Sequence, residues 1–596
     1  MSIKKVPSIQ IDYSRDSLFD ELGKKRLKES YSMEGEESPQ DRLAYVSKKF
    51  GSNSGHAQRL YDYSSKHWLS YSTPILSYGR NEKGLGISCF LNYVSDTTEG
   101  LVDNLSETNW LSMLGGGVGI HFGIRPTDEK SSGVMAHAKT YDASSMAYKQ
   151  GSTRRGSYAL YLDISHPEIL QFLEMRKPTG DPNLRALNLH HAVNIPDAFM
   201  QKIEDLMVDE NADDSWDLIN PHDGSIAKTV SAKDLWQRLL ELRIQTGEPY
   251  FHFIDRSNEF LPDFLKDKGL RINQSNLCSE IILPTNKNRT AVCCLSSLNL
   301  EHYDEWKDDK LFIKDVMEML DNVLETFIKT APSEISRAIW SAMSERSVGL
   351  GALGFHALLQ KKMIPFESPM AKSVNMSIFK HIKDEVDKAN LHLGATRGEA
   401  IDTRGTGRRF SLTMAIAPNA STSLIMGNTS PSIEPFRANA YRQDTLSGAY
   451  LNKNKYLDEI ISDRFTTDEA KKIWSSIISN DGSIQHLDDF TELEKEIFKT
   501  AIEIDQRWII EHAADRQQFI DQAQSLNLFF RPTVSVVYLH AIHFMAWKRG
   551  LKTLYYCRSE KVSKSDKIAE SIEREIIEEL DVSAMIDANS CLACEG

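Results

Sequence analysis

Short apolar segments alternate with amphipathic helices along most of the chain, and this alternation limits the folds that the chain can adopt. In "VMEMLDNVLETFIKTAP", helical spacing places Val316, Leu320 and Phe327 on one apolar face, and the helix is expected to end before Pro332. The segments "SLTMAIAPNA" and "LKTLYY" are typical of β-strands. From Ser72 onward, the pattern therefore predicts an α/β protein with a parallel core sheet.

Composition divides the chain into five predicted regions. The first is polar, with a helix expected to start near Asp41, and the last contains one acidic helix, "DKIAESIEREIIEEL". The regions are 1–71 (N-terminal helices), 72–442 (main part of the α/β core), 443–530 (a mostly helical insertion), 531–560 (the final strand region) and 561–596 (the acidic helix and a C-terminal tail).

Composition also disfavours several classes of protein. The N-terminus lacks the apolar core of a signal peptide, and the stretch "VSVVYLHAIHFMAW" is too short to span a membrane, so we expect a cytoplasmic protein. The net charge of −14 disfavours sequence-independent binding of nucleic acid, although a local pocket could still hold an anionic substrate. Seven cysteines without a secretion signal favour thiol chemistry or buried thiols over a disulfide framework.

Common nucleotide and metal motifs are absent from the sequence. In "GGGVGIHFG", Phe122 stands where a dinucleotide fingerprint needs glycine, and no phosphate loop of the Walker type occurs. The C-terminal "CLAC" contains Cys591 and Cys594, but no second C-x-x-C completes a zinc site. We therefore expect no metal bound by this chain.

The segment "SNLCSEIILPT" places an amide, a thiol and a carboxylate at a spacing of two. In an extended segment, Asn276, Cys278 and Glu280 would share one face. One interpretation is a half-exposed strand with a buried cysteine. The other is a reactive sulfur flanked by a hydrogen-bonding amide and a base.

Three further features carry possible chemistry. "AVCCLSSLNL" contains adjacent cysteines on what reads as a strand, so only one of Cys293 and Cys294 can face a given site, and "GISCFLNYVSDT" adds Cys89. "APNASTSLIMGNTSPSIEP" follows an apolar strand and could hold phosphate, or be an ordinary Ser/Thr-rich connection. "LKTLYYCRS" contains Tyr555 and Tyr556, a pairing that is usually packing.

Together these segments resemble one enzyme family. "NLCSE", "AVCCLSSLNL", "APNASTSLIMGNTSPSIEP", "KTLYY" and the cysteine-bearing tail occur in this order in the large, catalytic subunit of class I ribonucleotide reductases. The resemblance runs from about Ser72 to the C-terminus. It implies a ten-stranded α/β barrel with a central finger loop that carries Cys278, and reduction of ribonucleoside diphosphates to deoxyribonucleotides for DNA synthesis, under the control of dNTP effectors.

The resemblance also implies roles for the thiols. Cys278 matches the thiyl radical that abstracts the 3′ hydrogen of the ribose, Glu280 the base for the 3′-hydroxyl, and Asn276 the amide that holds the substrate. Cys89 and Cys293 match the pair that supplies reducing equivalents and closes into a disulfide. Cys294, beside Cys293, departs from the family pattern.

A radical must reach Cys278 from outside, because ordinary side chains do not generate one. The resemblance implies a metal-containing small (beta) subunit as the source, with Tyr555 and Tyr556 carrying the radical and no cofactor bound by this chain. Adjacent residues of a regular strand point to opposite faces, so two stacked rings would require an irregular backbone at this position.

Binding residues follow from the same resemblance, as does a homodimer. Asp96, seven residues after Cys89, matches the effector site, and "KQGSTRRGSY" the loop that links effector to substrate. Only 88 residues precede Cys89, which leaves little room for the family's N-terminal ATP-cone, so we expect specificity control without a dATP on/off switch. The implied substrate residues are Ser72, Thr73, Ser88, Gly116, Gly117, Ala420, Ser421 and Thr422, and the implied effector residues are Asp96, Thr97, Thr98 and Arg125.

The terminal cysteines complete the expected cycle. The resemblance implies that Cys591 and Cys594 reduce the buried disulfide and are then reduced by thioredoxin or glutaredoxin. Three alternatives are an adenosylcobalamin-dependent reductase, a catalytically inactive nucleotide-binding paralogue, and a general thiol–disulfide oxidoreductase built around "CLAC". The tyrosine pair argues against the first, the full set of cysteines against the second, and the long body of the chain against the third.

Overall fold

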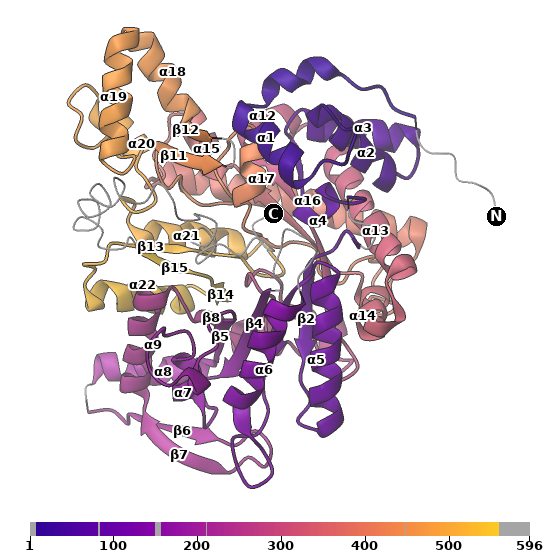
Figure 1. Ribbon diagram of the computed structural model, residues 1–596, viewed down its shortest axis with the longest axis vertical. Coiled ribbons are helices and arrows are strands. Elements are labelled where there is room, and N and C mark those ends of the chain that lie inside the picture. Colours follow the sequence, from indigo (N-terminus) through magenta and orange to yellow (C-terminus); the bar gives the residue numbers. More distant parts are fainter. Residues whose placement is uncertain (1–7, 81–83, 149–156, 210, 446–447, 560–596) are drawn as a thin grey trace, which may run out of the picture.

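The protein folds as a mixed α/β barrel with helices around it (Figure 1). The computed structural model describes residues 8–80, 84–148, 157–209, 211–445 and 448–559. The acidic segment, the two terminal cysteines Cys591 and Cys594, and most of "KQGSTRRGSY" lie outside these ranges. Within the described ranges, no helix combines the length and the apolar character that crossing a membrane requires.

The central sheet contains two groups of strands that run in opposite directions. Strands β2, β3, β4, β5 and β8 are mutually parallel in that order, and β9 is parallel to β10. Antiparallel pairing of β2 with β9, and of β8 with β14, joins the two groups. Strand β1 pairs with the C-terminal part of β9. The strands are β1 (Leu69–Tyr71), β2 (Cys89–Tyr93), β3 (Gly117–His121), β4 (Ser157–Asp163), β5 (His190–Ile195), β8 (Tyr250–Phe253), β9 (Ala291–Asn299), β10 (Val348–Leu353) and β14 (Thr553–Leu554).

Two short segments close the sheet into a ring. Leu350 of β10 forms a parallel bridge with Met414, and Ile416 forms another with Gln524. The amide of Tyr555 then donates to the carbonyl oxygen of Leu526 at 2.9 Å, next to β14. The ring therefore has ten strand positions, and the prediction of an α/β barrel is confirmed.

Three smaller sheets lie beside the barrel. A hairpin of β6 and β7 projects at the bottom of Figure 1, and a second hairpin and one parallel pair lie near the later helices. Their strands are β6 (Ser215–Ile219), β7 (Ile226–Ser231), β11 (Ala440–Thr445), β12 (Gly448–Lys453), β13 (Leu528–Phe530) and β15 (Cys557–Ser559).

Helices precede the barrel and surround it (Figure 1). The N-terminal helices are α1 (Glu21–Ser30), α2 (Pro39–Phe50) and α3 (Ser54–Ser65), and a capping box at Ser38 starts α2 close to the expected Asp41. The longer helices that follow are α5 (Thr98–Met113), α6 (Gly133–Ala147), α8 (Asp197–Val208), α9 (Ala232–Thr246), α13 (Phe312–Thr330), α14 (Ser336–Glu345), α16 (Pro369–Arg397), α18 (Lys455–Arg464), α19 (Thr467–Ser479), α21 (Gln506–Gln517) and α22 (Val536–Lys548).

Short helices occupy many of the connections. They are α4 (Thr73–Leu76), α7 (Ile169–Leu173), α10 (Ile254–Glu259), α11 (Asp263–Lys266), α12 (Tyr303–Trp306), α15 (Phe355–Lys361), α17 (Ala420–Ile425) and α20 (Glu492–Ile497). The helix expected before Pro332 is α13, and its predicted face, with Val316, Leu320 and Phe327, is buried against the rest of the core. The division into five regions stays a prediction.

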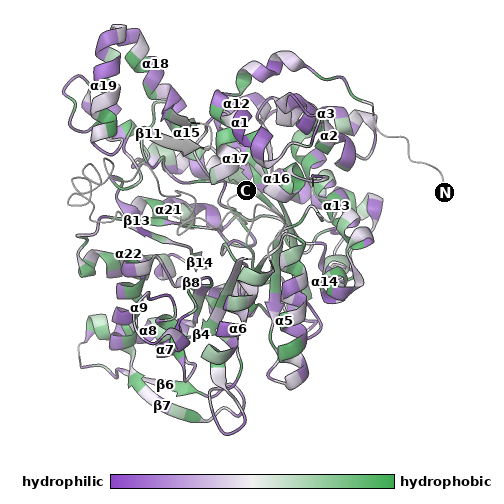
Figure 2. Cartoon of the chain, in the orientation of Figure 1, coloured by the Kyte–Doolittle hydropathy of each residue, from purple (hydrophilic) through white to green (hydrophobic). Residues whose placement is uncertain are grey.

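Alternation along the strands separates two apolar environments. In β4, Tyr158, Leu160 and Leu162 belong to the large core outside the barrel, whereas Ala159 and Tyr161 belong to a cluster inside it. Green, hydrophobic residues accordingly line these strands along much of their length (Figure 2). The interior is filled by side chains, so groups that project inward are removed from bulk water.

Candidate active site

The segment that carries Cys278 is a buried turn inside the barrel. The amide of Ser279 donates to the carbonyl oxygen of Asn276 at 3.3 Å, and the amide of Ile281 donates to Oδ1 of Asn276 at 3.1 Å. Ser279 has a φ of 67°, in the left-handed region. The segment is therefore a turn, and it lies where the family resemblance implied a finger loop. Asn276, Cys278 and Glu280 do not share one face of an extended strand, because the backbone reverses between them.

Three neighbours that the sequence did not indicate hold this turn in place. The hydroxyl of Tyr161 donates to the carbonyl oxygen of Asn276 at 2.7 Å, and Ser525 Oγ donates to the carbonyl oxygen of Cys278 at 2.5 Å. Gly119 of β3 packs against the same turn, since a Cβ atom there would lie 2.0 Å from the Ser275 carbonyl oxygen. No local pattern could reveal these contacts, because the partners are far apart in the sequence.

Glu280 has the acid–base character that a general base needs. Its side chain is buried. Burial raises the pKa of Glu280 to about 7, even though hydrogen bonds from Asn276 and Ser525 act in the opposite direction. A carboxyl group with this pKa exchanges a proton readily near neutral pH.

Cys89 and Cys293 face each other across the seam between the two groups of strands. They are directly opposite residues of the antiparallel β2–β9 pair, and both belong to one cluster inside the barrel. Opposite residues of such a pair have Cα atoms about 4.5–5.5 Å apart, within the reach of a disulfide. Both are present as thiols. Cys294 points the other way, into the core outside the barrel.

The tyrosine pair contacts the Cys278 turn directly. Tyr555 Oη donates to Cys278 Sγ at 3.5 Å, and the centroids of the Tyr555 and Tyr556 rings lie 4.3 Å apart. β14 ends at Leu554 and β15 begins at Cys557, so the backbone between them is irregular, as predicted. Tyr250 of β8, which was not anticipated, packs against both rings at centroid distances of 4.7 and 5.0 Å.

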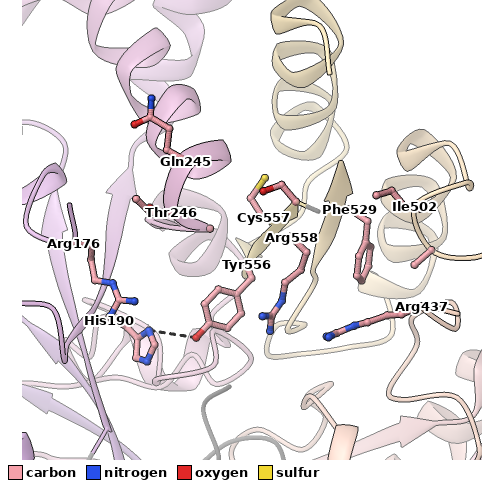
Figure 3. Close-up of a pocket in the computed structure, with 13 residues that line it drawn as sticks. Arg176, His190, Gln245, Thr246, Arg437, Ile502, Phe529, Tyr556, Cys557 and Arg558 are labelled. Carbon is pink, nitrogen blue, oxygen red and sulfur yellow. Dashed lines mark hydrogen bonds between the residues drawn. The ribbon is translucent and has the colours of Figure 1, made fainter. Parts of the chain in front are cut away.

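A charged cluster lies at the outer end of the tyrosine pair. The Tyr556 hydroxyl is 3.3 Å from His190 Nδ1 (Figure 3). The same nitrogen is 2.6 Å from Glu248 Oε1. Glu248 is completely buried, and Arg176 lies 3.7 Å from its other oxygen. Beside the cluster is a pocket of about 360 Å³ whose lining includes Arg176, His190, Tyr556 and Arg558.

The proposed substrate residues lie in two places, some beside the N-terminal helix α1 and others beside Cys89. Ser72 caps α4, Thr73 is its first residue, and Tyr31 Oη lies 3.2 Å from Thr73 Oγ1. Arg26 of α1 donates to Ser421 Oγ at 3.2 Å, which places a cation beside the proposed phosphate loop. Ala420 begins α17, with Ser421 and Thr422 in its first turn, and Ser88, Gly116 and Gly117 lie at the starts of β2 and β3 next to Cys89.

The proposed effector residues lie at the start of α5. Arg125 Nε donates to Asp96 Oδ2 at 2.8 Å, and Thr97 caps the helix by accepting from the amide of Gly100. Thr98 is the first residue of α5. His222, from the connection between β6 and β7, lies 3.1 Å from the same Asp96 oxygen and was missed because it is 126 residues away.

One cluster of metal-type ligands occurs among the described residues, and it is explained by ion pairs. His56, Asp315 and Glu318 lie together, but Arg59 donates to Asp315 at 2.6 Å and Arg397 contacts Glu318 at 2.7 Å. The acidic groups are thus neutralised by arginines, and nothing here argues for a metal.

The described site combines a cysteine in contact with an aromatic pair, a buried carboxyl that titrates near neutral pH, and two opposed thiols. Residues 87–403 and 399–557 match the family described as "Ribonucleotide reductase, barrel domain". Residues 17–84 match "Ribonucleotide reductase, all-alpha domain".

Individual relatives agree with these matches. The chain is 51% identical to the ribonucleoside-diphosphate reductase large subunit of Invertebrate iridescent virus 3, over 94% of this chain and 97% of that one. It is 48% identical to a putative large subunit of Frog virus 3, over 84% and 88% of the two chains. Among solved structures, it is similar to the Actinobacillus ureae class Id ribonucleotide reductase alpha subunit, with a TM-score of 0.81, 32% identity, and coverage of 93% and 99%.

Proposed function

We propose that this chain, which belongs to the ribonucleotide reductase family as a large subunit, reduces ribonucleoside diphosphates to 2′-deoxyribonucleoside diphosphates for DNA synthesis. The observation that carries this proposal is the contact between Tyr555 Oη and Cys278 Sγ, 3.5 Å apart inside the barrel. A buried cysteine sulfur beside a stacked tyrosine pair suits the transfer of a hydrogen atom, and a purely structural core has no need of that contact.

In the proposed reaction, an oxidised Cys278 sulfur takes the 3′ hydrogen of the ribose. Glu280 accepts the proton of the 3′-hydroxyl, and Asn276 holds the substrate. The 2′-hydroxyl then leaves as water, Cys89 and Cys293 supply two electrons and two protons, and a disulfide forms between them. Glu280 returns its proton to the 3′ oxygen. Cys278 finally returns its hydrogen atom to C3′, which restores the sulfur radical.

Radical supply is assigned to a separate subunit. Hard one-electron chemistry requires a cofactor, and we infer that a metal-containing small (beta) subunit holds it. The radical would pass through Tyr556 and Tyr555 to Cys278, along the line of ring contacts described above.

Substrate and effector binding are assigned to two separate places on the chain. Ser421 with Arg26 beside it would contact the substrate phosphates, since a guanidinium and a hydroxyl both bind phosphate oxygens. Asp96 and Arg125 would bind a dNTP effector that selects the substrate. A homodimer, and re-reduction through Cys591 and Cys594 by thioredoxin or glutaredoxin, complete the proposal.

The decisive experiment measures deoxyribonucleotide formation from ribonucleoside diphosphates with and without an added small subunit. We expect product only when the small subunit is present, and none from Cys278→Ser, which should still bind nucleotide. Activity that needs adenosylcobalamin instead would support the alternative reductase class. No product under either condition, from folded protein that binds nucleotide, would contradict the proposed function.

A further inference from the structure

Reduction of a disulfide between Cys89 and Cys293 places negative charge on a buried sulfur. Thiol–disulfide exchange proceeds through thiolates, and the sulfur that leaves takes an electron pair with it. Burial, together with Cys89, Cys294 and Glu280, raises the pKa of Cys293 well above its usual range. A hydrogen-bond donor at the Cys293 sulfur would therefore ease this step.

Gln522 supplies such a donor. Its Nε2 atom lies 3.8 Å from Cys293 Sγ, a hydrogen-bond distance for sulfur. The same nitrogen donates to the carbonyl oxygen of Val348 in β10 at 2.9 Å. Because a carbonyl oxygen only accepts, the amide nitrogen must be the atom that faces Val348 and Cys293. Gln522 is fully buried, so bulk water does not compete for its N–H groups.

A buried lysine holds the backbone that carries Gln522. Lys552 Nζ donates to the carbonyl oxygen of Asp521 at 2.7 Å and to that of Gln522 at 2.9 Å. The amide of Gln522 donates to the carbonyl oxygen of Met414 at 3.1 Å. Both backbone polar groups of Gln522 are therefore bonded, and its side chain projects toward Cys293 from a fixed point.

The same segment also contacts the turn that carries Cys278. The amide of Ala523 donates to the carbonyl oxygen of Glu280 at 2.9 Å. Ser525 Oγ donates to the carbonyl oxygen of Cys278 at 2.5 Å. Residues 521–525 thus contact the reducing pair through Gln522 and the Cys278 turn through the residues that follow it.

The Cys293 sulfur is enclosed more closely than that of Cys89. Gly349 of β10 packs against it, since a Cβ atom there would lie 3.3 Å from Cys293 Sγ. With Gln522 as a second neighbour, Cys293 is 1% exposed, against 3% for Cys89. These contacts favour attack of a reductant on Cys89, with Cys293 as the leaving sulfur.

We propose that Gln522 is a catalytic residue of the redox cycle, whose side-chain amide stabilises the Cys293 thiolate when the disulfide is reduced. This inference rests on the proposed function. A thiolate of the reductant attacks Cys89 Sγ, a new S–S bond forms there, and the Cys89–Cys293 bond breaks with its electron pair on Cys293. Gln522 donates to that thiolate until it is protonated. The second thiol of the reductant then displaces Cys89, so the reductant leaves as a disulfide and its two protons remain on the cysteines.

The test follows reduction of the Cys89–Cys293 disulfide by a small dithiol in Gln522→Met protein. This variant and its reference both carry Cys591→Ser and Cys594→Ser, so that the terminal thiols take no part. Methionine keeps the length of the side chain but donates no hydrogen bond. Reduction should slow about tenfold, the lower end of what a hydrogen bond to a charged group contributes. Free thiols are trapped by alkylation at set times and quantified by mass spectrometry of the two cysteine peptides.

The direction of the change separates stabilisation of charge from a structural role. A variant that merely loosened the barrel would expose the disulfide and speed its reduction. Gln524→Met is the matched control, because Gln524 lies two residues further along, is also buried, and donates to the carbonyl oxygen of Ala513 at 2.9 Å. It should not slow the reduction. An unchanged or faster rate in Gln522→Met, or an equal slowing in both variants, would overturn the proposal.

Alkylation of the reduced thiol gives a second measurement, with a pH profile. In Cys89→Ser protein the rate at Cys293 follows its thiolate fraction, so Gln522→Met should need a pH about one unit higher to reach the same rate. The remaining titratable groups that raise the pKa of Cys293 are Cys294 and Glu280. Cys294 faces the core outside the barrel, so its own alkylation reports any opening of the sheet. Coincident pH profiles with and without Gln522→Met would overturn the proposal.

A second substitution covers failure of the methionine variant to fold. Gln522→Asn gives the same comparison, because its amide is one methylene shorter and ends short of Cys293. Both measurements use the full chain without substrate or small subunit. Failure of the wild-type chain to form deoxyribonucleotide with its small subunit would instead refute the proposed function, so the two outcomes are distinguishable.

Discussion

Cys89 and Cys293 are directly opposite residues on antiparallel strands at the seam of the barrel, and both side chains face its interior. Cys294, the next residue, faces the opposite side of the sheet. This relationship agrees with the choice of Cys293 over Cys294 that the family resemblance implied. It also places a potential disulfide where the two groups of strands meet.

Substitution of the two adjacent cysteines should therefore give opposite results. Cys293→Ser should abolish repeated turnover, because the reducing pair cannot form its disulfide. Cys294→Ala should leave turnover close to wild type and lower the free energy of unfolding by about 1 kcal/mol, a typical effect of a small core truncation. Product formation and thermal unfolding are measured on both variants. The reverse order of effects would show that Cys294 is the redox partner.

The buried Glu280 predicts a pH dependence. Its pKa is raised to about 7, and a general base must be ionised, so kcat/KM should rise as pH increases through 7. At pH 6, about one tenth of the carboxyl groups would be charged, and activity should be about tenfold below its plateau. Steady-state rates between pH 5.5 and about 8.5 test this.

A neighbouring residue supplies the control for that profile. Ser525 Oγ donates to Glu280 Oε2 at 3.1 Å and lowers its pKa. Ser525→Ala should therefore shift the acidic limb to higher pH, whereas Glu280→Gln should remove activity at every pH. A limb that stays near pH 4.5, the ordinary range of a glutamate, would contradict the assignment.

Gly119 lies close to the turn that carries Cys278, so a substitution outside the reacting groups should also lower turnover. An alanine Cβ would meet the Ser275 carbonyl oxygen at 2.0 Å and Asn276 Cα at 2.8 Å, and both are backbone atoms that cannot rotate away. Gly119→Ala should displace the turn, lower stability by about 1–3 kcal/mol and sharply reduce turnover. Gly55→Ala in α3, with its nearest neighbour at 3.4 Å, is the control and should be neutral.

Much of the fold followed from local pattern, and the exceptions have physical causes. The apolar face of α13 and the α/β alternation could be predicted from the sequence, because the residues that recur with the period of the element are also the buried ones. The segment "SLTMAIAPNA" was expected to be a strand but forms only single bridges at Met414 and Ile416. The Asp521 carboxylate accepts from the amides of Thr413 and Met414 at 2.9 and 2.8 Å, so these two amides do not pair with a neighbouring strand.

Site residues could be predicted from the sequence only where they lie in recognisable motifs. Resemblance indicated Cys278, Glu280 and the tyrosine pair, but it gave no hint of the residues that surround them. Tyr161, Tyr250, Glu248 and His190 come from strands or their flanking turns, and a sequence spacing cannot show which strands become neighbours in a closed barrel. Their roles depend on tertiary contacts alone.

The ion pairs of Asp96 predict its part in specificity. Asp96 binds Arg125 and His222, which belong to two other connections, so it can couple an effector to distant segments. Asp96→Ala should reduce effector-dependent choice between two competing substrates by about tenfold, a normal size for coupling between sites, while basal turnover is retained. Exposed Asp103 on α5 provides the control variant, Asp103→Ala. Unaltered choice in Asp96→Ala would place the effector elsewhere.

Burial of the reducing pair predicts a need for the terminal cysteines. Cys89 is 3% exposed and Cys293 is 1% exposed, so a bulky reductase cannot reach a disulfide between them. Exchange requires a thiolate to approach a sulfur directly. The 32 residues from Ser559 to Cys591 could span at most about 110 Å, which is ample for delivery to a barrel interior.

Cys591→Ser or Cys594→Ser should consequently complete about one turnover with thioredoxin or glutaredoxin as reductant and then stop, because the buried disulfide remains oxidised. A small dithiol should restore continued turnover, since it enters the barrel without a carrier. The burst and the steady rate are followed by product formation after rapid mixing. Normal cycling of both variants with the protein reductant would show that the buried pair is reduced by another route. Cys278→Ser is the control: it should be inactive with either reductant, which distinguishes loss of the radical step from loss of re-reduction.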